Sequence, residues 1–217
     1  MKKLLFVFSL LICSWAAIAQ TDPAVKEILD QVSKKYDSYK TMRSDFTLEV
    51  KDAQGQSYTN TGIMLFNKAK GQYRIQIQHD DIISDGESVW SISKELKEIQ
   101  VTEAENNPSS IGPHNLFTFY KTGYKYLNMP NEHIVKNGKR ETARVIELSP
   151  EDNNTNYFKI KLRINNNDHI QDITIFDKAN NRYVYTIQSM YVNQDIPARH
   201  FSFNKNNYPG YEIVDLR

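Results

Sequence analysis

The sequence predicts a mainly β protein with a few helices, in which one antiparallel sheet curls on itself. Many short segments alternate apolar and polar residues, as strands with one buried face do. Residues that favour turns separate these segments, and only two stretches show helical spacing. The links between successive strands are too short for helical crossovers, so we expect neighbouring strands to pair antiparallel.

The first half opens with a helix and continues with strands. Asp22 is the expected N-cap, and Pro23 occupies the first helical turn. Apolar and aromatic residues then recur at helical spacing: Val25, Ile28, Leu29, Val32 and Tyr36. Strands are expected after this helix at residues 46–50, 58–66, 73–77, 81–84, 88–92 and 97–101.

The strands pause between residues 106 and 126, where Pro108 and Pro113 indicate an irregular loop. A second helix is expected after this loop, with four apolar or aromatic residues on one face: Leu116, Phe117, Tyr120 and Tyr124. Strands resume at residues 158–164, around residues 173–175 and at residues 183–187, with clusters of asparagine between them.

The strand faces require a curved sheet. By our count, roughly twenty large apolar groups lie on one face of about ten strands. A helix is about 10–12 Å wide and strands lie about 4.8 Å apart, so two helices cannot cover such a face if it stays flat. A curled sheet with partial helical cover can enclose an apolar pocket. A sandwich or narrow barrel filled by its own side chains is the alternative, and the residues alone leave both open.

The N-terminus has the pattern of a cleaved signal peptide. Lys2 and Lys3 precede an apolar run over residues 4–12, and residues 17–19 form a small-x-small cleavage site. Lipidation of Cys13 is the alternative. It requires a small residue directly before the cysteine, and an isoleucine stands there. We therefore expect cleavage after residue 19 and export to the periplasm.

The expected mature chain, residues 20–217, is a single domain without linkers or low-complexity tracts. It has no cysteine, and its positive and negative charges nearly balance. Nothing in this balance favours binding to nucleic acid. No other stretch is long and apolar enough to cross a bilayer, so a soluble protein is expected.

The motifs of known enzyme classes are missing. The chain has no Gly-x-Ser-x-Gly elbow, no phosphate-binding glycine loop and no cysteine nucleophile after processing. Its five histidines show no metal-ligand spacing. We expect neither an enzyme nor a bound metal or other cofactor.

Several segments in chain order resemble the LolA family, the periplasmic carriers of outer-membrane lipoproteins. The sharpest are Ile83-Ser84-Asp85-Gly86 and Val89-Trp90. The others are the helix from Val25, residues 42–47, 62–66, 72–75, 98–101, 198–203 and 208–215. The resemblance covers essentially the whole expected mature chain.

The resemblance implies an incomplete, strongly curved antiparallel β-barrel, with helices as a lid over an apolar cavity. The cavity would receive the acyl chains of lipoproteins. The carrier, expected to be a monomer, would take them from an inner-membrane ATP-driven exporter and release them to an outer-membrane acceptor. Related members of this fold keep an alternative open, a lipid-sensing regulatory or interaction module in envelope-stress signalling.

The strands of both halves supply the expected cavity lining: Phe46, Leu48, Met64, Phe66, Tyr73, Ile75, Trp90, Phe158, Ile160, Leu162, Ile173, Ile175, Tyr183 and Tyr185. A plain core position for Trp90 is the alternative reading. Outside the cavity, the alternating cations of residues 159–163 suggest either a basic docking stripe or, in preference, a solvated strand face.

The expected lid residues are Leu116, Phe117 and Tyr120. The family often has an Arg-Pro pair after the strand that here ends at residue 66, and that arginine helps to hold the lid closed. Lys68 and Ala69 occupy these positions. Lysine lacks the planar fork of arginine, so Lys68 is a possible lid contact of a different kind.

Overall fold

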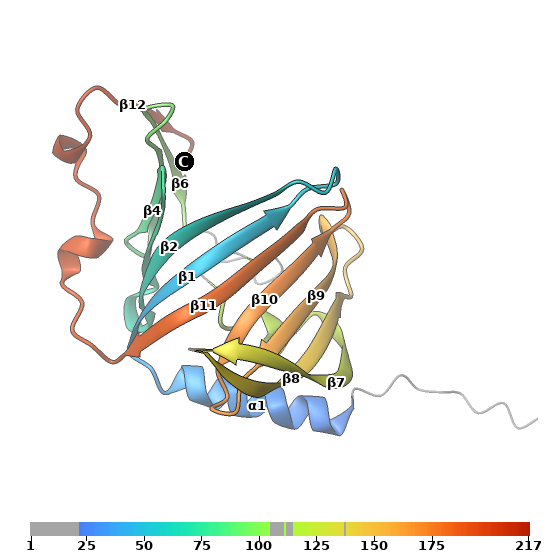
Figure 1. The fold of residues 1–217 in the computed structure, drawn as a ribbon. Helices are drawn as coiled ribbons and strands as arrows, with labels where there is room; N and C mark the ends of the chain where they lie inside the picture. The colour runs from blue at the N-terminus through green and yellow to red at the C-terminus, as the bar shows by residue number, and fades with distance from the viewer. Residues whose placement is uncertain (1–21, 105–110, 112–114, 137) are drawn as a thin grey trace, which may run out of the picture.

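The computed structural model (Figure 1) describes residues 22–104, 111, 115–136 and 138–217. The expected signal peptide and the two loop prolines, Pro108 and Pro113, lie outside the described residues. In the described part of the chain, no helix has the length and apolar character needed to span a membrane.

One twelve-stranded sheet forms the body of the protein, with the spatial order β12-β6-β5-β4-β3-β2-β1-β11-β10-β9-β8-β7. Its strands are β1 (Thr41–Lys51), β2 (Ser57–Asn67), β3 (Gln72–Ile77), β4 (Asp80–Ser84), β5 (Ser88–Ser93), β6 (Glu98–Glu103), β7 (Tyr124–Lys136), β8 (Lys139–Pro150), β9 (Tyr157–Ile164), β10 (Ile170–Asp177), β11 (Arg182–Val192) and β12 (Glu212–Asp215). All neighbours pair antiparallel except β12, which pairs parallel with β6.

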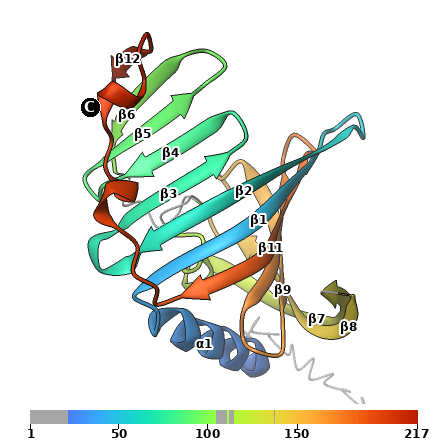
Figure 2. The same cartoon turned by 60° about the vertical axis from the view of Figure 1, so that its left-hand side comes forward.

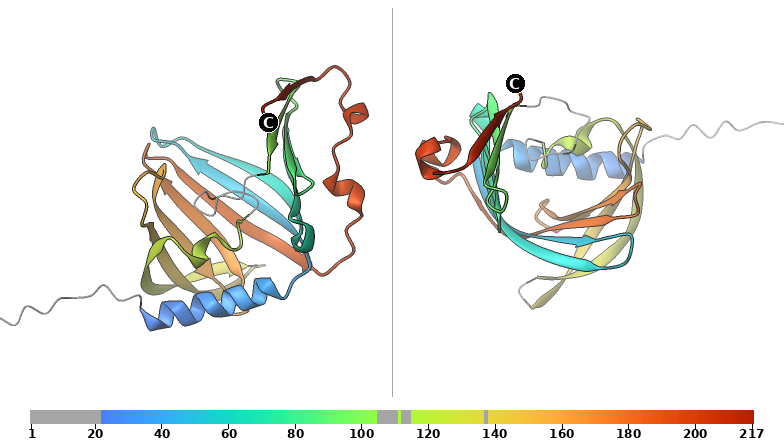
Figure 3. Two further views of the ribbon diagram at one scale, coloured as in Figure 1. Left: turned by 180° about the vertical axis from the view of Figure 1, so that it is seen from behind. Right: turned by 90° about the horizontal axis from the view of Figure 1, so that it is seen from above.

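The sheet is strongly curved, and its two ends do not meet. Figure 2 shows the face of β1 to β6, and the view from above in Figure 3 shows how the sheet bends around the space that α1 partly closes. The sequence prediction of a mainly β, incomplete antiparallel barrel with a partial helical cover is confirmed.

Helix α1 (Pro23–Asp37) begins and ends where its sequence dictates. The Asp22 carboxylate accepts a hydrogen bond from the backbone N–H of Ala24 at 2.9 Å, and Pro23 occupies a position that needs no N–H donor. Its apolar face is buried against the concave side of the sheet through Val25, Leu29, Val32 and Tyr36.

The second expected helix is wrong. Residues 115–118 form turns, and only the 3₁₀-helix η2 (Phe119–Lys121) follows. Gly123 adopts a positive φ of 84°, which ends the segment before β7 begins. The residues expected on the helical face are nevertheless buried, because tight turns can also direct them inward.

The Ile83-Ser84-Asp85-Gly86 motif ends β4 and begins the turn that leads to β5. The Asp85 carboxylate accepts hydrogen bonds from the N–H groups of Glu87 and Ser88, at 2.9 and 2.8 Å. Gly86 has a φ of 100°, and a Cβ there would collide with the carbonyl oxygen of Lys70. Asp85 and Gly86 therefore serve the geometry of this turn.

Candidate functional site

The concave face of the sheet and its cover share one apolar cluster. The sheet contributes side chains such as Phe46, Met64, Ile75, Ile160 and Leu162, all buried. The cover contributes the apolar face of α1 and, from the segment before β7, Leu116, Phe117, Phe119 and Tyr120. In this closed arrangement the side chains of the cover pack against those of the sheet.

The structure places most of the expected lining residues on this concave face. Eleven of them belong to the cluster or pack against it: Phe46, Leu48, Met64, Phe66, Tyr73, Ile75, Ile160, Leu162, Ile173, Ile175 and Tyr185. Tyr183 lies at the rim, in a hollow of about 380 Å³ that it shares with Ile111, Tyr157, Ile175 and Tyr185. Ligand binding by these residues stays a prediction.

Trp90 lies on the opposite, convex face, so its assignment to the cavity lining is corrected. In β5 it stands opposite Ile83 and Val101, whereas its neighbour Val89 faces the concave cluster. The Trp90 ring stacks on Phe203, with the centroids 5.4 Å apart. The C-terminal segment packs over this part of the convex face, so β5 makes apolar contacts on both of its faces.

Phe158 is also on the convex face, where half of its surface is exposed. The pairing of β9 with β10 shifts register so that Asp177 stands opposite Tyr157 while Phe176 stands opposite Lys159. Phe158 is the extra residue of this β-bulge, and the bulge reverses the alternation of faces. Its ring lies 6.2 Å from that of Phe176, outside the cluster.

The lid segment, residues 115–121, is held against α1 by an aromatic contact. Phe117 stacks on Tyr36 with ring centroids 4.7 Å apart, and Tyr120 is fully buried. The Tyr36 hydroxyl accepts a hydrogen bond from the N–H of Ile170 at 3.1 Å, which anchors the helix to β10. Burial raises the pKa of Tyr36 and of Tyr120, so both rings stay neutral.

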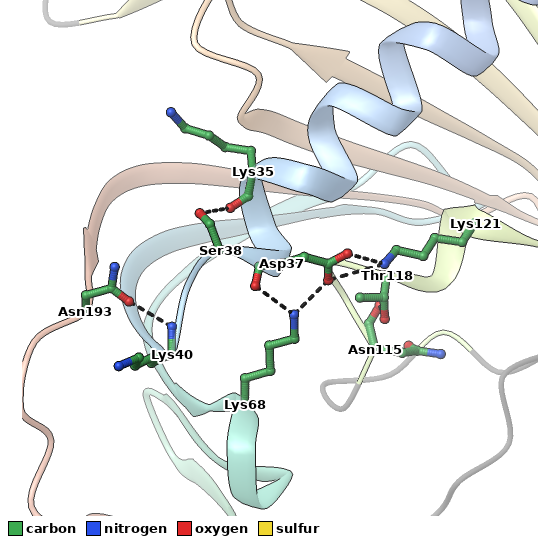
Figure 4. Close-up of polar contacts among 9 residues, drawn as sticks. All are labelled: Lys35, Asp37, Ser38, Lys40, Lys68, Asn115, Thr118, Lys121 and Asn193. Carbon is green, nitrogen blue, oxygen red and sulfur yellow. Dashed lines mark hydrogen bonds and ion pairs between the residues drawn. The ribbon is translucent and has the colours of Figure 1, made fainter.

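A shared carboxylate joins α1, the sheet and the lid segment (Figure 4). The ammonium group of Lys68, which follows β2, lies 2.7 Å from one oxygen of Asp37, and that of Lys121 lies 3.1 Å from the other. We call these three residues the clasp. The hydrogen bond from Lys68 holds the pKa of Asp37 below its ordinary value, and Lys121 acts in the same direction.

The expected contact of Lys68 with the lid is therefore indirect, through Asp37. Sequence reasoning missed Asp37 and Lys121. One signal was available: an acid in the last turn of a helix opposes the helix dipole and calls for cationic partners.

The basic residues of β9 are paired with acids of the neighbouring strands. Lys159 contacts Glu147 at 3.3 Å, and Arg163 contacts the buried Asp172 at 2.8 Å. Lys161 pairs with Glu132 of β7. The stripe is therefore largely neutralised, in agreement with the reading as an outer strand face and not with a basic docking surface.

Two further hollows border the lid. One of about 630 Å³ lies between α1, η2 and β7, and another of about 240 Å³ lies beside the clasp, between Phe66, Phe117 and Lys68. In the described part of the chain, no three His, Cys, Asp or Glu side chains gather as a metal site would require.

One family model matches residues 37–204, that of the outer membrane lipoprotein carrier protein LolA. The chain belongs to the LolA family. The resemblance stated from the sequence is thereby confirmed, and the family is described by carriage of a ligand, not by catalysis. A search of curated protein sequences finds no match.

Solved structures are similar at low identity. An uncharacterized conserved protein from Thermus thermophilus matches with a TM-score of 0.56 and 8% identity, over 88% of this chain and 99% of that chain. A LolA superfamily protein from Nitrosomonas europaea has a TM-score of 0.45 and 14% identity, over 82% and 97%. Lipoprotein LppX from Mycobacterium tuberculosis has 0.47 and 10%, over 81% and 98%. The likeness to the Thermus protein concerns the fold alone.

Proposed function

We propose that this LolA family protein is a periplasmic carrier that shields the acyl chains of lipoproteins. One observation carries the proposal: the lid segment buries large apolar side chains in the concave cluster, yet its ion pair with α1 belongs to an exposed clasp. Ion pairs at such positions contribute at most about 1 kcal/mol each. An acyl ligand that replaces the apolar contacts of the lid can therefore open it.

The chemistry of the cluster suits acyl chains. Its side chains are mostly aliphatic, aromatic and thioether groups, and several tyrosine hydroxyls among them are held by hydrogen bonds within the protein. Each methylene group that enters gains about 0.8 kcal/mol on transfer from water. Summed over an acyl chain, that gain is large enough to displace a few lid residues. It depends little on the protein part of the lipoprotein.

The route belongs to the proposal as well. Residues 1–19 direct export and are removed, and residues 20–217 act as a monomer in the periplasm. The carrier receives lipoproteins from an inner-membrane ATP-driven exporter and delivers them to an acceptor at the outer membrane. Family membership supports this route.

Two nearby positions of β9 supply a matched test. Ile160 is fully buried in the concave cluster, and Phe158 is half exposed on the convex face. Mature protein is mixed with a fluorescent triacylated lipopeptide, and the complex is measured by fluorescence anisotropy. We expect Ile160→Asp to abolish binding, because an unpaired carboxylate would sit among apolar groups, and Phe158→Asp to leave it unchanged.

A milder variant keeps the test valid if Ile160→Asp does not fold. Leu48→Gln alters a half-buried wall residue of the same cluster and should weaken binding while the circular dichroism spectrum stays the same. Native mass spectrometry of periplasmic protein then identifies the bound molecule. Recovery of a signalling protein in place of triacylated lipoproteins would favour the regulatory alternative.

A further inference from the structure

Strand β7 ends the sheet, so one of its sides has no partner strand among the described residues. Its backbone pairing follows from one bond: the N–H of Glu151 donates to the carbonyl oxygen of Gly123 at 3.0 Å. In an antiparallel ladder every second pair exchanges hydrogen bonds, so Lys125 and Leu127 bond to β8. The N–H and C=O groups of Tyr126 and Asn128 consequently point away from β8.

The two halves of this edge differ. From Pro130 onward the edge is blunted, because proline supplies no N–H and the register shifts between Met129 and Glu132. Glu132 also reaches over β8 to pair with Lys161. The first half, up to Met129, has neither a proline nor a register shift, and it presents Leu127 with 58% of its surface exposed.

The hollow of about 630 Å³ borders this first half at Tyr126, and its volume is in the size range of ligand sites. One part of its wall is apolar and another part is charged. Leu29 and Tyr120 belong to the apolar cluster, whereas Lys26, Asp30 and Lys121 are charged. The hollow therefore leads from the acyl site to solvent and passes Tyr126 of the edge strand.

We propose that this edge binds the extended peptide that follows the lipidated residue of the cargo, as an added strand beside residues 124–129. The inference rests on the proposed carrier function, since it places the cargo's acyl chains in the concave cluster. Main-chain pairing reads no side-chain sequence, which suits a carrier of many different lipoproteins. The lipidated residue, where the acyl chains join the peptide, then lies against the polar wall of the hollow.

The test compares two fluorescent probes with the same acyl groups: a triacylated hexapeptide and a triacylated cysteine methyl ester without the peptide. We expect the wild-type protein to bind the lipopeptide about tenfold more tightly, as two or three main-chain hydrogen bonds allow. Asn128→Pro removes an outward N–H and no bond to β8, so it should bind both probes equally. Asn128→Ala, the matched control, keeps the N–H and the tenfold preference.

A lipopeptide with N-methylated backbone amides makes the same test from the ligand side, should the proline variant not fold. The wild-type protein should bind it no more tightly than the ester. A full preference for the lipopeptide in Asn128→Pro, or equal affinities in the wild-type protein, overturns the peptide site while ester binding still supports the carrier function. Failure of the wild-type protein to bind even the ester overturns both proposals.

Discussion

At the scale of single residues, Asp37 is the point where three parts of the molecule meet. It ends α1, where a negative charge opposes the helix dipole, and two lysines offset this cost. Lys68 reaches it from the 3₁₀ turn that follows β2, and Lys121 from the lid segment. The clasp thus links α1, the residue after β2 and the lid segment through one carboxylate.

We predict that Asp37→Asn loosens the lid with little effect on global stability, by no more than about 1 kcal/mol, because all three side chains are exposed. Hydrogen exchange of residues 115–121 should accelerate, whereas exchange in β9 should not change. Asp30→Asn, a change to an acid of the same helix that the ion pairs do not include, is the control. An unaltered lid exchange rate would remove the clasp from the mechanism.

The lowered pKa of Asp37 fixes the direction of a pH effect. A carboxyl with a depressed folded pKa contributes stability above its unfolded value, about 3.9, and loses it as pH falls through the folded pKa. Protection factors of the lid amides should therefore decrease below about pH 4 in the wild-type protein. In Asp37→Asn they should be low already and show no such step.

Position 62 requires glycine because there is no room for a side chain. A Cβ at this position would lie 2.6 Å from the ring of Phe46 and 2.7 Å from the carbonyl oxygen of Gln76. The ring can rotate, but the backbone oxygen of β3 cannot yield. We predict that Gly62→Ala costs roughly 1–3 kcal/mol in urea denaturation, while Thr61→Ala, an exposed neighbour, costs less than about 0.5.

At the scale of elements, the sequence predicted the strands whose alternation is regular and whose ends are turn residues. It assigned the first six strands and β9 to β11, but Phe158 shows its limit: a bulge reverses the faces without any change in composition. Strands β7 and β8 were not anticipated. Pro130 and the register shift interrupt β7, so its pattern does not hold one period over its length.

The convex face escaped prediction for a related reason. A strand with an apolar residue on both sides needs a second cover, and here the distant C-terminal segment supplies it. Phe203 and Tyr208 continue the stack on Trp90, with their rings 5.6 Å apart. Ile83, Ile92 and Ile99 are buried beneath it. No local pattern connects segments so far apart in the chain.

Trp90→Ala tests whether this side chain packs under the C-terminal segment on the convex face. Loss of the ring should cost about 2–4 kcal/mol in urea denaturation, because the ring packs against the buried isoleucines of the convex face and stacks on Phe203. The affinity for a triacylated lipopeptide should stay within about twofold of the wild-type value, since the ring lies outside the concave cluster. If Trp90→Ala greatly lowers the affinity without changing the stability, then Trp90 lines the ligand cavity after all.

At the scale of the whole molecule, the lid's side chains and the cargo's acyl chains are expected to bind the same concave face of the curved sheet. The sequence predicted that the apolar face exceeds its cover but could not decide between a hollow and a filled interior. In the structure, side chains of the lid and of α1 pack against the concave face, and hollows of about 630, 380 and 240 Å³ are lined by residues of the same cluster. Cargo and lid then compete, and the affinity for cargo contains the cost of opening.

This competition makes a prediction that a preformed cavity does not. Phe117 is buried, stacks on Tyr36 and belongs to the cover, not to the sheet. Phe117→Ala should lower the stability of the unloaded protein by about 2–4 kcal/mol, since the ring leaves a void in the cluster. The same variant should bind a triacylated ester more tightly, because less lid contact has to be broken.

Calorimetry of the unloaded protein and fluorescence anisotropy of the ester measure the two effects separately. Ile160→Ala is the matched comparison, because it weakens the sheet's wall, which cargo and lid share, and should lower both stability and affinity. If Phe117→Ala instead lowers affinity in parallel with stability, the lid residue is part of the cargo's binding surface. Opening would then not displace it, and the closed structure would already be the binding state.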